Sequence, residues 1–311
     1  MGPAPEVLAR IAAIASDNRS GADLLARQAA EALELQAGES WRATSELREA
    51  LTGAARRLVA AQPAMAPIFQ LANAALFAAD GCVDAVSLSG AVIAVCRRFT
   101  ARIQTAQEVI SEAARREIPE GGTVLTHSSS STVLAALLSA CRAGRRFSVI
   151  CTESRPMFEG VALAKALAAA RIPVTLIADA AVYHHFQKAS LAVSGADTIA
   201  WQGVLNKAGT ALVALAARAH RKKFLVLAGT HKLFPADREL IWERSENPRE
   251  ILPEECAGLH VSNLYFDLTP LDLVTAVVTE EGTFSPATVR RRLRRLQVHP
   301  ALASTGAPPA A

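Results

Sequence analysis

Residues 194–221 read SGADTIAWQGVLNKAGTALVALAARAHR, and this stretch contains the pattern that decides the fold. A short apolar run before it ends at Gly195-Ala196-Asp197, as a buried strand ends in a turn. A polar turn follows, and Asn206-Lys207-Ala208-Gly209-Thr210 then leads into a helix rich in Ala and Leu. In open α/β sheets, ligands bind outside the carboxyl ends of the strands, near helix N-termini that attract anions. The two turns therefore predict a ligand site.

Three side chains of these turns are candidates for chemistry. Asp197 occupies the place where an acid or base acts, and Asn206 and Lys207 lie where an oxygen-rich anion is held. A buried structural aspartate that caps a helix explains Asp197 about as well when this stretch is taken alone. The rest of the chain decides between the two interpretations.

The composition indicates a protein with a sizeable core and little net charge. The chain has 311 residues, of which 51% are hydrophobic, 5% aromatic and 20% charged. Alanine supplies much of the apolar content, which suits packed helices better than a β-sandwich. The formal net charge of +4 is too small to indicate a nucleic-acid partner, although it suits an anionic small molecule.

The cysteines and the N-terminal residues bear on the compartment. Five scattered cysteines show neither a CxxC pair nor zinc-type spacing, so we expect reduced thiols and no metal site. The N-terminus lacks the basic-then-apolar pattern of a secretory signal. These features predict a soluble cytoplasmic protein without membrane contact.

The first third of the chain is helical in pattern. From residue 7 to about residue 117 there is hardly any alternation of period two, and helices are expected at residues 44–61, 67–79 and 85–117. The clearest punctuation in the chain follows at Ile118-Pro119-Glu120-Gly121-Gly122. We therefore expect an all-helical N-terminal domain over residues 1–118 and a second domain over residues 119–311.

In the second domain, short apolar runs alternate with helical patterns, which predicts parallel βαβ units and an α/β fold. The expected strands are residues 123–126, 147–152, 172–178, 191–193, 223–228 and 273–279. The expected helices are residues 131–141, 158–170, 181–188 and 205–220. Residues 237–261, rich in charge and interrupted by prolines, are expected to leave the sheet before its last strand.

The loop after the first expected strand carries His127, Ser128, Ser129 and Ser130. Serine hydroxyls and free backbone N–H groups at a helix N-terminus form a good phosphate cradle. Simple N-capping by Ser130 or Ser131 explains the same residues about as well.

Two further loops add cations to the same edge of the expected sheet. Arg155 follows the second strand and is suited to a bidentate grip on phosphate or carboxylate, while a structural pair with Glu153 or an aspartate is the alternative. Lys232 follows the strand at residues 223–228. Asp179, after the third strand, is expected to cap a helix.

Several common catalytic motifs are absent from the sequence. It contains no GxGxxG and no Walker A pattern, so no nucleotide cofactor is expected. A GxSxG elbow is also absent, and His127 and Ser128 are neighbours on an extended chain, so a Ser–His–Asp hydrolase is disfavoured.

The order of these motifs resembles a single superfamily over nearly the whole chain. It comprises the α, β and δ regulatory subunits of eukaryotic translation initiation factor 2B, ribose-1,5-bisphosphate isomerase and 5-methylthioribose-1-phosphate isomerase. The motifs are Thr126-His127-Ser128, Thr152-Glu153-Ser154-Arg155-Pro156 with Glu159-Gly160, Gly195-Ala196-Asp197, Asn206-Lys207-x-Gly209-Thr210 and Asp267-Leu268-Thr269-Pro270. The resemblance implies a helical N-terminal domain, a Rossmann-like C-terminal domain, and homodimers that assemble into larger homo-oligomers.

The resemblance also implies roles for individual residues. In the isomerases, a cysteine after Thr-His and the aspartate of Gly-Ala-Asp form the catalytic pair; Asp197 matches the aspartate, and Ser128 stands where the cysteine is expected. Ser20-Gly21-Ala22 resembles the family's Arg-Gly-Ala segment, with Ser20 in place of the arginine. The expected ligand-binding residues are Ser20, Gly21, Ala22, His127, Ser129, Ser130, Arg155, Asn206, Lys207 and Lys232.

Two hypotheses remain open at this point. In the first, the chain is an aldose–ketose isomerase of a phosphorylated pentose, with Asp197 as acid and base and Ser128 as a weaker partner than the thiol it replaces. In the second, it is a non-catalytic sugar-phosphate or nucleotide-binding regulatory protein, as the loss of the cysteine suggests.

Overall fold

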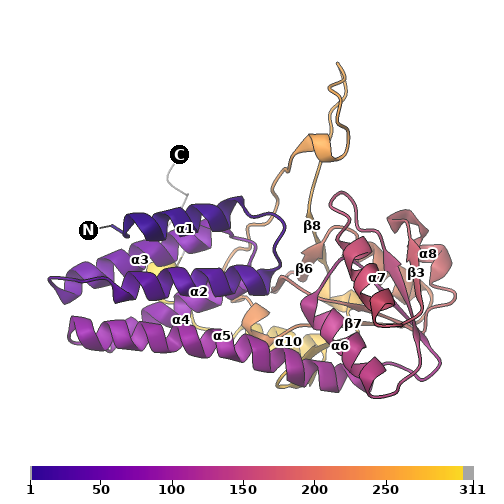
Figure 1. Ribbon diagram of the computed structural model, residues 1–311, viewed down its shortest axis with the longest axis horizontal. Helices are drawn as coiled ribbons and strands as arrows, with labels where there is room; N and C mark the ends of the chain where they lie inside the picture. The colour runs from indigo at the N-terminus through magenta and orange to yellow at the C-terminus, as the bar shows by residue number, and fades with distance from the viewer. Residues whose placement is uncertain (1, 304–311) are drawn as a thin grey trace. The chain divides into compact units, whose positions relative to one another are not determined.

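The computed structural model describes residues 2–303, which form two compact units (Figure 1). The helical unit consists of residues 2–104, His231–Leu240 and residues 292–303. The sheet unit consists of Thr105–Thr230 and Ile241–Arg291. The long helix α5 (Ala85–Arg115) starts in the helical unit and ends in the sheet unit.

The helical unit is built from amphipathic helices that pack through small residues. Besides the first part of α5, its helices are α1 (Pro5–Ser16), α2 (Ala22–Gly38), α3 (Thr44–Ala61) and α4 (Ala66–Asp80). In α1 the buried residues Val7, Ile11 and Ile14 recur at the spacing of one helical face. Most of the buried positions of α2 are alanines, which leave room for the neighbouring helices to approach closely.

The sheet unit contains a seven-stranded sheet in the order β10-β9-β7-β4-β1-β2-β3. Its strands are β1 (Thr123–Thr126), β2 (Ser148–Thr152), β3 (Val174–Ile177), β4 (Leu191–Ser194), β7 (Lys223–Leu227), β9 (Ala276–Thr279) and β10 (Gly282–Phe284). All neighbouring pairs are parallel except β9 with β10. The predicted fold class, helices followed by a mostly parallel α/β sheet, is confirmed.

The strand order places a topological switch point between β1 and β4. From β1 the chain adds β2 and β3 on one side, and it then returns to add β4, β7 and β9 on the other. Loops that leave the carboxyl ends of β1 and β4 therefore run in opposite directions, which is where doubly wound sheets bind ligands.

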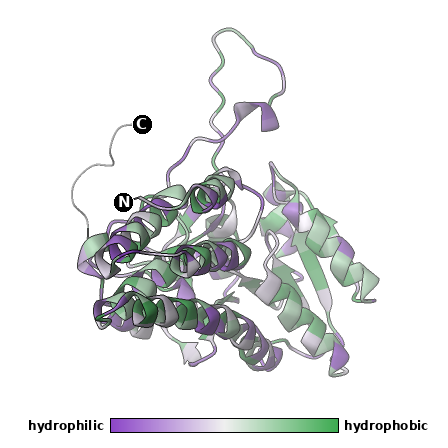
Figure 2. Cartoon of the chain, turned by 60° about the vertical axis from the view of Figure 1, so that its left-hand side comes forward, coloured by the Kyte–Doolittle hydropathy of each residue, from purple (hydrophilic) through white to green (hydrophobic). Residues whose placement is uncertain are grey.

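The core of this unit lies between the sheet and the helices that cross over it. The helices after β1, β2, β3 and β6 are α6 (Ser131–Arg142), α7 (Glu159–Ala169), α8 (Val182–His185) and α9 (Thr210–Ala219), and α10 (Pro286–Leu293) follows β10. Val124, Val149 and Val193 of the strands are buried in one cluster with Ile110 of α5 and Leu137 of α6. Figure 2 shows these strands in the green of hydrophobic residues, as expected for a sheet covered on both faces.

A second, three-stranded sheet was not predicted. It consists of β5 (Thr198–Ile199), β6 (Val204–Lys207) and β8 (Phe266–Thr269), all antiparallel. The prediction of a helix from residue 205 was therefore wrong at its start, because α9 begins only at Thr210. Gly209, with φ 108°, breaks the chain direction there, since a left-handed backbone favours glycine.

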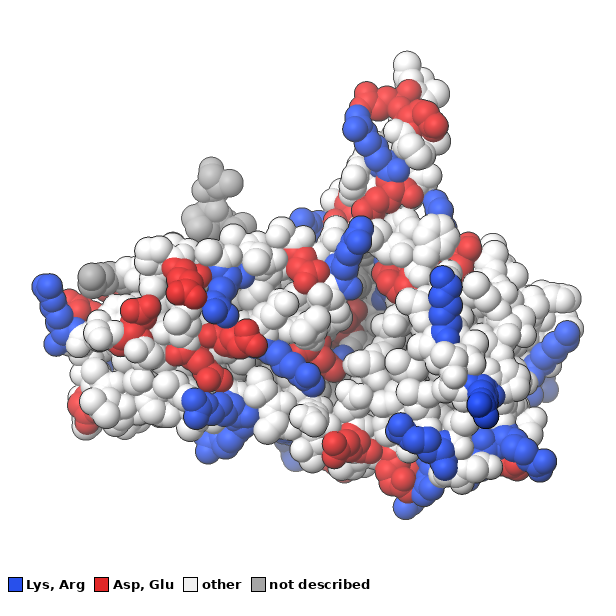
Figure 3. All heavy atoms as spheres, viewed as in Figure 1, with Lys and Arg blue, Asp and Glu red and all other residues white. Residues whose placement is uncertain are grey.

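The expected last strand and the excursion before it are also placed by the structure. The predicted strand at residues 273–279 is shorter, because Leu271–Leu273 forms a 3₁₀ turn and only Ala276–Thr279 pairs with β7. Between residues 241 and 265 the chain leaves the sheet and forms one 3₁₀ turn, Pro248–Glu250. Figure 3 shows acidic side chains gathered on this excursion. No helix among residues 2–303 has the length and hydrophobicity needed to cross a bilayer.

Candidate functional site

The loops after β1 and β4 pack directly against each other at the switch point. A Cβ atom added to Gly195 would lie 2.5 Å from Oγ of Ser130, so only glycine allows this approach. Ser128 lies two residues before this contact on one loop, and Asp197 two residues after it on the other. The fold thus brings the two predicted catalytic loops together.

The serine cluster divides into residues with different environments. Oγ of Ser130 accepts a hydrogen bond from the backbone N–H of Val133 at 3.3 Å, so Ser130 caps α6. Ser129 is exposed, and Ser128 is half-buried. Ser128 has a left-handed backbone, with φ 63°, and within residues 2–303 its hydroxyl makes no hydrogen bond.

Asp197 is the last residue of the turn between β4 and β5 and is half-buried. Its backbone N–H donates to the carbonyl of Leu205 at 3.0 Å, which fixes the turn against β6. Asn206 continues this link, since its Nδ2 donates to Oγ of Ser194 and to Oγ1 of Thr210, each at 3.0 Å. The buried Asn206 amide therefore ties the end of β4 to the start of α9, with both donor hydrogens used.

Lys207 is buried and already has a counter-ion. Its Nζ lies 2.8 Å from Oε1 of Glu159 and 4.4 Å from the centre of the Tyr265 ring, and only 6% of its side chain is exposed. The other carboxylate oxygen of Glu159 is buried and has no hydrogen-bond partner among the described residues. An anionic ligand reaching Lys207 would compete with Glu159.

Asp267, a residue of the Asp267-Leu268-Thr269-Pro270 motif that was not among the predicted site residues, holds the N-terminus of α9. Its carboxylate accepts hydrogen bonds from the backbone N–H groups of Gly209 at 2.7 Å and Ala211 at 3.1 Å. Burial raises the pKa of Asp267 to about 6, although these two N–H groups act in the opposite direction. The helix N-terminus that the sequence offered to an anionic ligand is therefore already occupied by a carboxylate.

Arg155 is exposed and extends from the loop after β2. Its guanidinium carbon lies 5.0 Å from the centre of the Phe158 ring, and Nη2 is 3.5 Å from the carbonyl of Glu250. The prediction that Asp179 caps a helix is wrong. Its two carboxylate oxygens accept the backbone N–H groups of Ser154 at 2.8 Å and Arg155 at 2.7 Å instead, because its position after β3 faces the neighbouring β2 loop.

His127 is buried at the end of β1 with both ring nitrogens engaged. Nε2 lies 2.8 Å from the carbonyl of Ala208, and Nδ1 lies 2.7 Å from Oγ1 of Thr152. Because a carbonyl only accepts, Nε2 carries the proton and the Thr152 hydroxyl donates to Nδ1. Burial lowers the pKa of His127, although the Ala208 carbonyl and Asp179 act in the opposite direction, so the ring is neutral.

The remaining predicted residues belong to the helical unit. Gly21 and Ala22 form the start of α2, and the backbone N–H of Ser20 donates to Asp17. Lys232 is buried with its Nζ 3.2 Å from Oδ1 of Asp23, which also lies 3.0 Å from Nε2 of His231. Burial alone would raise the pKa of Asp23, but the charge of Lys232 and the hydrogen bond with His231 lower it below its ordinary value.

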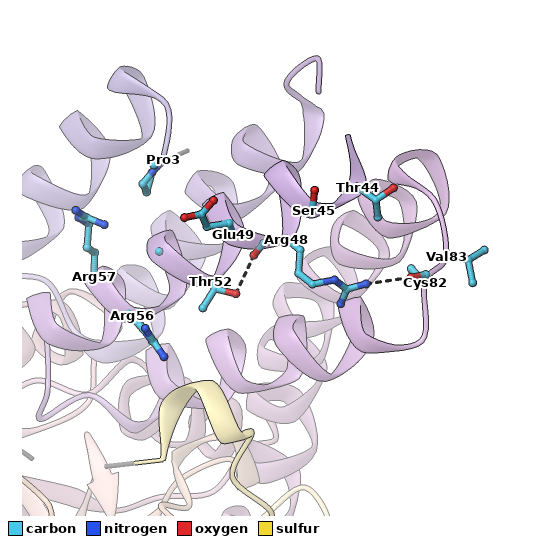
Figure 4. Close-up of a pocket in the computed structure, with 12 residues that line it drawn as sticks. Pro3, Thr44, Ser45, Arg48, Glu49, Thr52, Arg56, Arg57, Cys82 and Val83 are labelled. Carbon is cyan, nitrogen blue, oxygen red and sulfur yellow. Dashed lines mark hydrogen bonds between the residues drawn. The ribbon is translucent and has the colours of Figure 1, made fainter. Parts of the chain in front are cut away.

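A pocket of about 760 Å³ lies elsewhere in the helical unit, along α3 (Figure 4). Arg48 points across it and donates to the carbonyls of Ala79 at 2.8 Å and Cys82 at 3.0 Å, which caps the end of α4. Arg56 donates to the carbonyl of Ala301 at 2.8 Å. Within residues 2–303, no group of three His, Cys, Asp or Glu side chains is placed to hold a metal ion.

The doubly wound sheet, with its polar loops at the switch point and helices before it, defines a Rossmann-like α/β protein. Residues 18–286 match the model of the initiation factor 2 subunit family, and the chain belongs to this family. The family resemblance drawn from the sequence motifs is thereby confirmed.

Two curated relatives and one solved structure are similar over most of the chain. Ribose 1,5-bisphosphate isomerase of Archaeoglobus fulgidus is 36% identical over 286 residues, covering 90% of each chain. The protein of the same name from Pyrococcus furiosus is 32% identical over 279 residues, covering 86% of each. The Pyrococcus horikoshii translation initiation factor eIF-2B structure has a TM-score of 0.79 and 30% identity, covering 91% of this chain and 98% of that one.

Proposed function

We propose that this chain is an aldose–ketose isomerase of a phosphorylated pentose, with ribose 1,5-bisphosphate as the first substrate to test. The proposal rests on its similarity to two proteins named ribose 1,5-bisphosphate isomerase. The contact between Gly195 and Ser130 at the switch point supports it, because it holds the loops of Asp197 and Ser128 together.

The reaction moves a hydrogen between two neighbouring carbons of the open-chain sugar and needs no oxidant. In the proposed mechanism the Asp197 carboxylate removes the proton from C2 and returns it to C1. The Ser128 hydroxyl donates a hydrogen bond to the sugar oxygen that carries the developing negative charge. The atoms balance: the C1–O4 ring bond breaks and O4 takes up a proton, the C2 proton is returned at C1, and the 2-hydroxyl releases its proton as the C2 carbonyl forms.

Ser128 is expected to make this a slow enzyme. A cysteine thiol has a pKa of about 8.5, whereas a serine hydroxyl releases its proton far less readily. General acid–base assistance contributes roughly 10²–10⁴-fold per positioned group, so turnover through Asp197 alone stays measurable. The exposed Arg155 guanidinium supplies an accessible cation for a phosphate group.

A direct assay tests the proposal. Formation of the ketose from ribose 1,5-bisphosphate is measured for the wild type, for Asp197→Asn and for Asp272→Asn. Asp272 is a suitable control because its side chain is 75% exposed and its ion pair is with Arg290, in another part of the sheet unit. We expect turnover that only Asp197→Asn abolishes. Absence of product with the wild type, or equal rates for all three proteins, would refute the proposal.

A regulatory protein that binds a sugar phosphate or nucleotide without turning it over is the second candidate. In its favour are Ser128, which the motif resemblance aligns with the cysteine of the isomerases, and the similarity to an eIF-2B structure. Calorimetry with ribose 1,5-bisphosphate distinguishes the two, because binding without product supports the regulatory function. A homodimer or larger homo-oligomer stays a prediction, which light scattering checks.

A further inference from the structure

A buried chain of hydrogen bonds connects His127 to the backbone of Ser128 by way of the neighbouring strand. Oγ1 of Thr152 lies 2.7 Å from Nδ1 of His127 and 3.0 Å from Oγ of Ser154. Oγ of Ser154 lies in turn 2.7 Å from the backbone nitrogen of Ser128. His127, Thr152 and Ser154 are each no more than 2% exposed, so water does not replace these contacts.

The chemistry of the groups fixes the direction of every bond in the chain. Because Nε2 of His127 donates to the Ala208 carbonyl, Nδ1 can only accept, and the Thr152 hydroxyl donates to it. Thr152 then accepts from the Ser154 hydroxyl, which leaves an Oγ lone pair for the Ser128 N–H. Each donor has one acceptor, and reversing either the Thr152–Ser154 or the His127–Thr152 link would leave two acceptors facing each other.

The chain ends on a backbone that needs support. Ser128 and Ser154 have left-handed conformations, with φ 63° and 62°, which cost non-glycine residues energy unless the surroundings hold them. Asp179 anchors Ser154 from the other side by accepting its N–H at 2.8 Å. The two strained residues are thus fastened to each other across the ends of β1, β2 and β3.

The His127 ring itself is locked in place and is not open to a ligand. Its two nitrogens are both used within the protein, and its carbon edge packs against the backbone of Gly209. A Cβ atom at Gly209 would lie 2.7 Å from Cε1 of His127, so only glycine allows the backbone to approach the ring this closely.

We propose that His127 is a positioning residue that fixes the backbone of Ser128 at the ligand site. It acts through the hydroxyls of Thr152 and Ser154 and does not touch the ligand. This proposal rests on the proposed function for its catalytic consequence, but its structural part holds whether or not the chain turns over a sugar phosphate.

Two substitutions of His127 distinguish the effect of its link to Thr152 from the effect of its contact with Ala208. His127→Asn retains an acceptor near the place of Nδ1 and loses the contact with Ala208. His127→Gln retains a donor near the place of Nε2 and loses the link to Thr152. Thr152→Val removes the hydroxyl at constant shape, and Thr152→Ser restores it. All are made in the full chain and compared by hydrogen–deuterium exchange of peptides covering residues 125–132 and by kcat/KM with ribose 1,5-bisphosphate.

We expect Thr152→Val and His127→Gln to speed exchange at Ser128 and to lower kcat/KM by roughly three- to tenfold, the value of one hydrogen bond. Thr152→Ser should stay near the wild type in both measurements, and His127→Asn should depart from the wild type less than His127→Gln. Unchanged exchange in Thr152→Val, or a greater effect of His127→Asn than of His127→Gln, would overturn the proposal. If exchange follows the expected order but the wild type makes no product, only the proposed function fails.

Discussion

Replacing Lys207 with methionine removes one partner of the buried ion pair in the sheet unit. The pair joins Nζ to Oε1 of Glu159 at 2.8 Å, with 6% and 26% of the two side chains exposed. Methionine keeps the length of the side chain, so the substitution removes the charge with little change in volume. The carboxylate left behind then has both of its oxygens without a cationic partner, since Oε2 is already without one among the described residues.

The expected cost follows from the burial of the pair. Removing one partner of a buried ion pair costs about 3–5 kcal/mol, and the partial exposure of Glu159 places this case near about 3 kcal/mol. Loss of the contact between the ammonium group and the Tyr265 ring adds roughly 0.5–1 kcal/mol. In the double variant with Glu159→Gln no charge is left buried, so we expect it to be more stable than Lys207→Met alone.

Urea denaturation at pH 7 measures these differences, and the chain offers a matched control. Lys223 pairs with Glu117 at nearly the same distance, 2.9 Å, but 60% and 31% of those side chains are exposed. Lys223→Met should therefore cost no more than about 1 kcal/mol. If Lys207→Met and Lys223→Met lower the free energy of unfolding equally, burial of the Lys207 pair does not have the effect reasoned here.

Three further predictions concern other residues of the sheet unit. Ser128→Cys should raise kcat for ribose 1,5-bisphosphate by about tenfold or more, because a thiol is a stronger acid than the serine hydroxyl, whereas Ser129→Cys on the exposed neighbouring position should not. Gly160→Ala should lower the free energy of unfolding by more than about 1 kcal/mol, because its Cβ would lie 1.9 Å from the carbonyl oxygen of Thr152; Gly90→Ala, with nothing within 4 Å, should not destabilise in the same urea titration. Asp267 has a folded-state pKa raised from 3.8 to about 6, so its contribution to stability is present below pH 3.8 and is lost as the pH rises through 6. Relative to Asp267→Asn, the wild type should lose about 3 kcal/mol between pH 3.5 and pH 7, and a constant difference would contradict this.

The bounds of helices and strands were predicted accurately where the sequence signal is local. The helix at Thr44–Ala61 and the strand at Thr123–Thr126 have the predicted bounds, because apolar spacing and flanking turn residues both lie within a few positions. The strand β6 was missed because its partner β8 lies far along the chain, opposite it at Asn206 and Asp267. The four residues of β6 are too few to show a periodic hydrophobic pattern, and its pairing with a distant strand cannot be seen in the local sequence.

The sequence predicted which loops form the site better than it predicted the partners of the side chains on those loops. A lysine after a strand predicts a cation at the ligand-binding edge, but nothing local indicates its counter-ion. Glu159 lies 48 positions from Lys207, and Asp23 and Lys232 are even further apart in the sequence. Tertiary pairing of this kind depends on the register of whole elements, which residue patterns do not specify.

The resident carboxylates have a consequence for which ligands the chain can hold. In the sheet unit, Lys207 faces Glu159 and the N-terminus of α9 faces Asp267, so both positive features are neutralised without a ligand. A singly charged anion would be attracted to these positive groups no more strongly than the carboxylate that it displaces. The exchange would also leave the displaced carboxylate buried without a partner, which costs free energy. A phosphate group carries close to two charges at neutral pH and three acceptor oxygens, so it can repay the exchange where a carboxylic acid cannot. Selection for a phosphorylated ligand would then arise from the cost of displacing Glu159, in addition to attraction by Lys207.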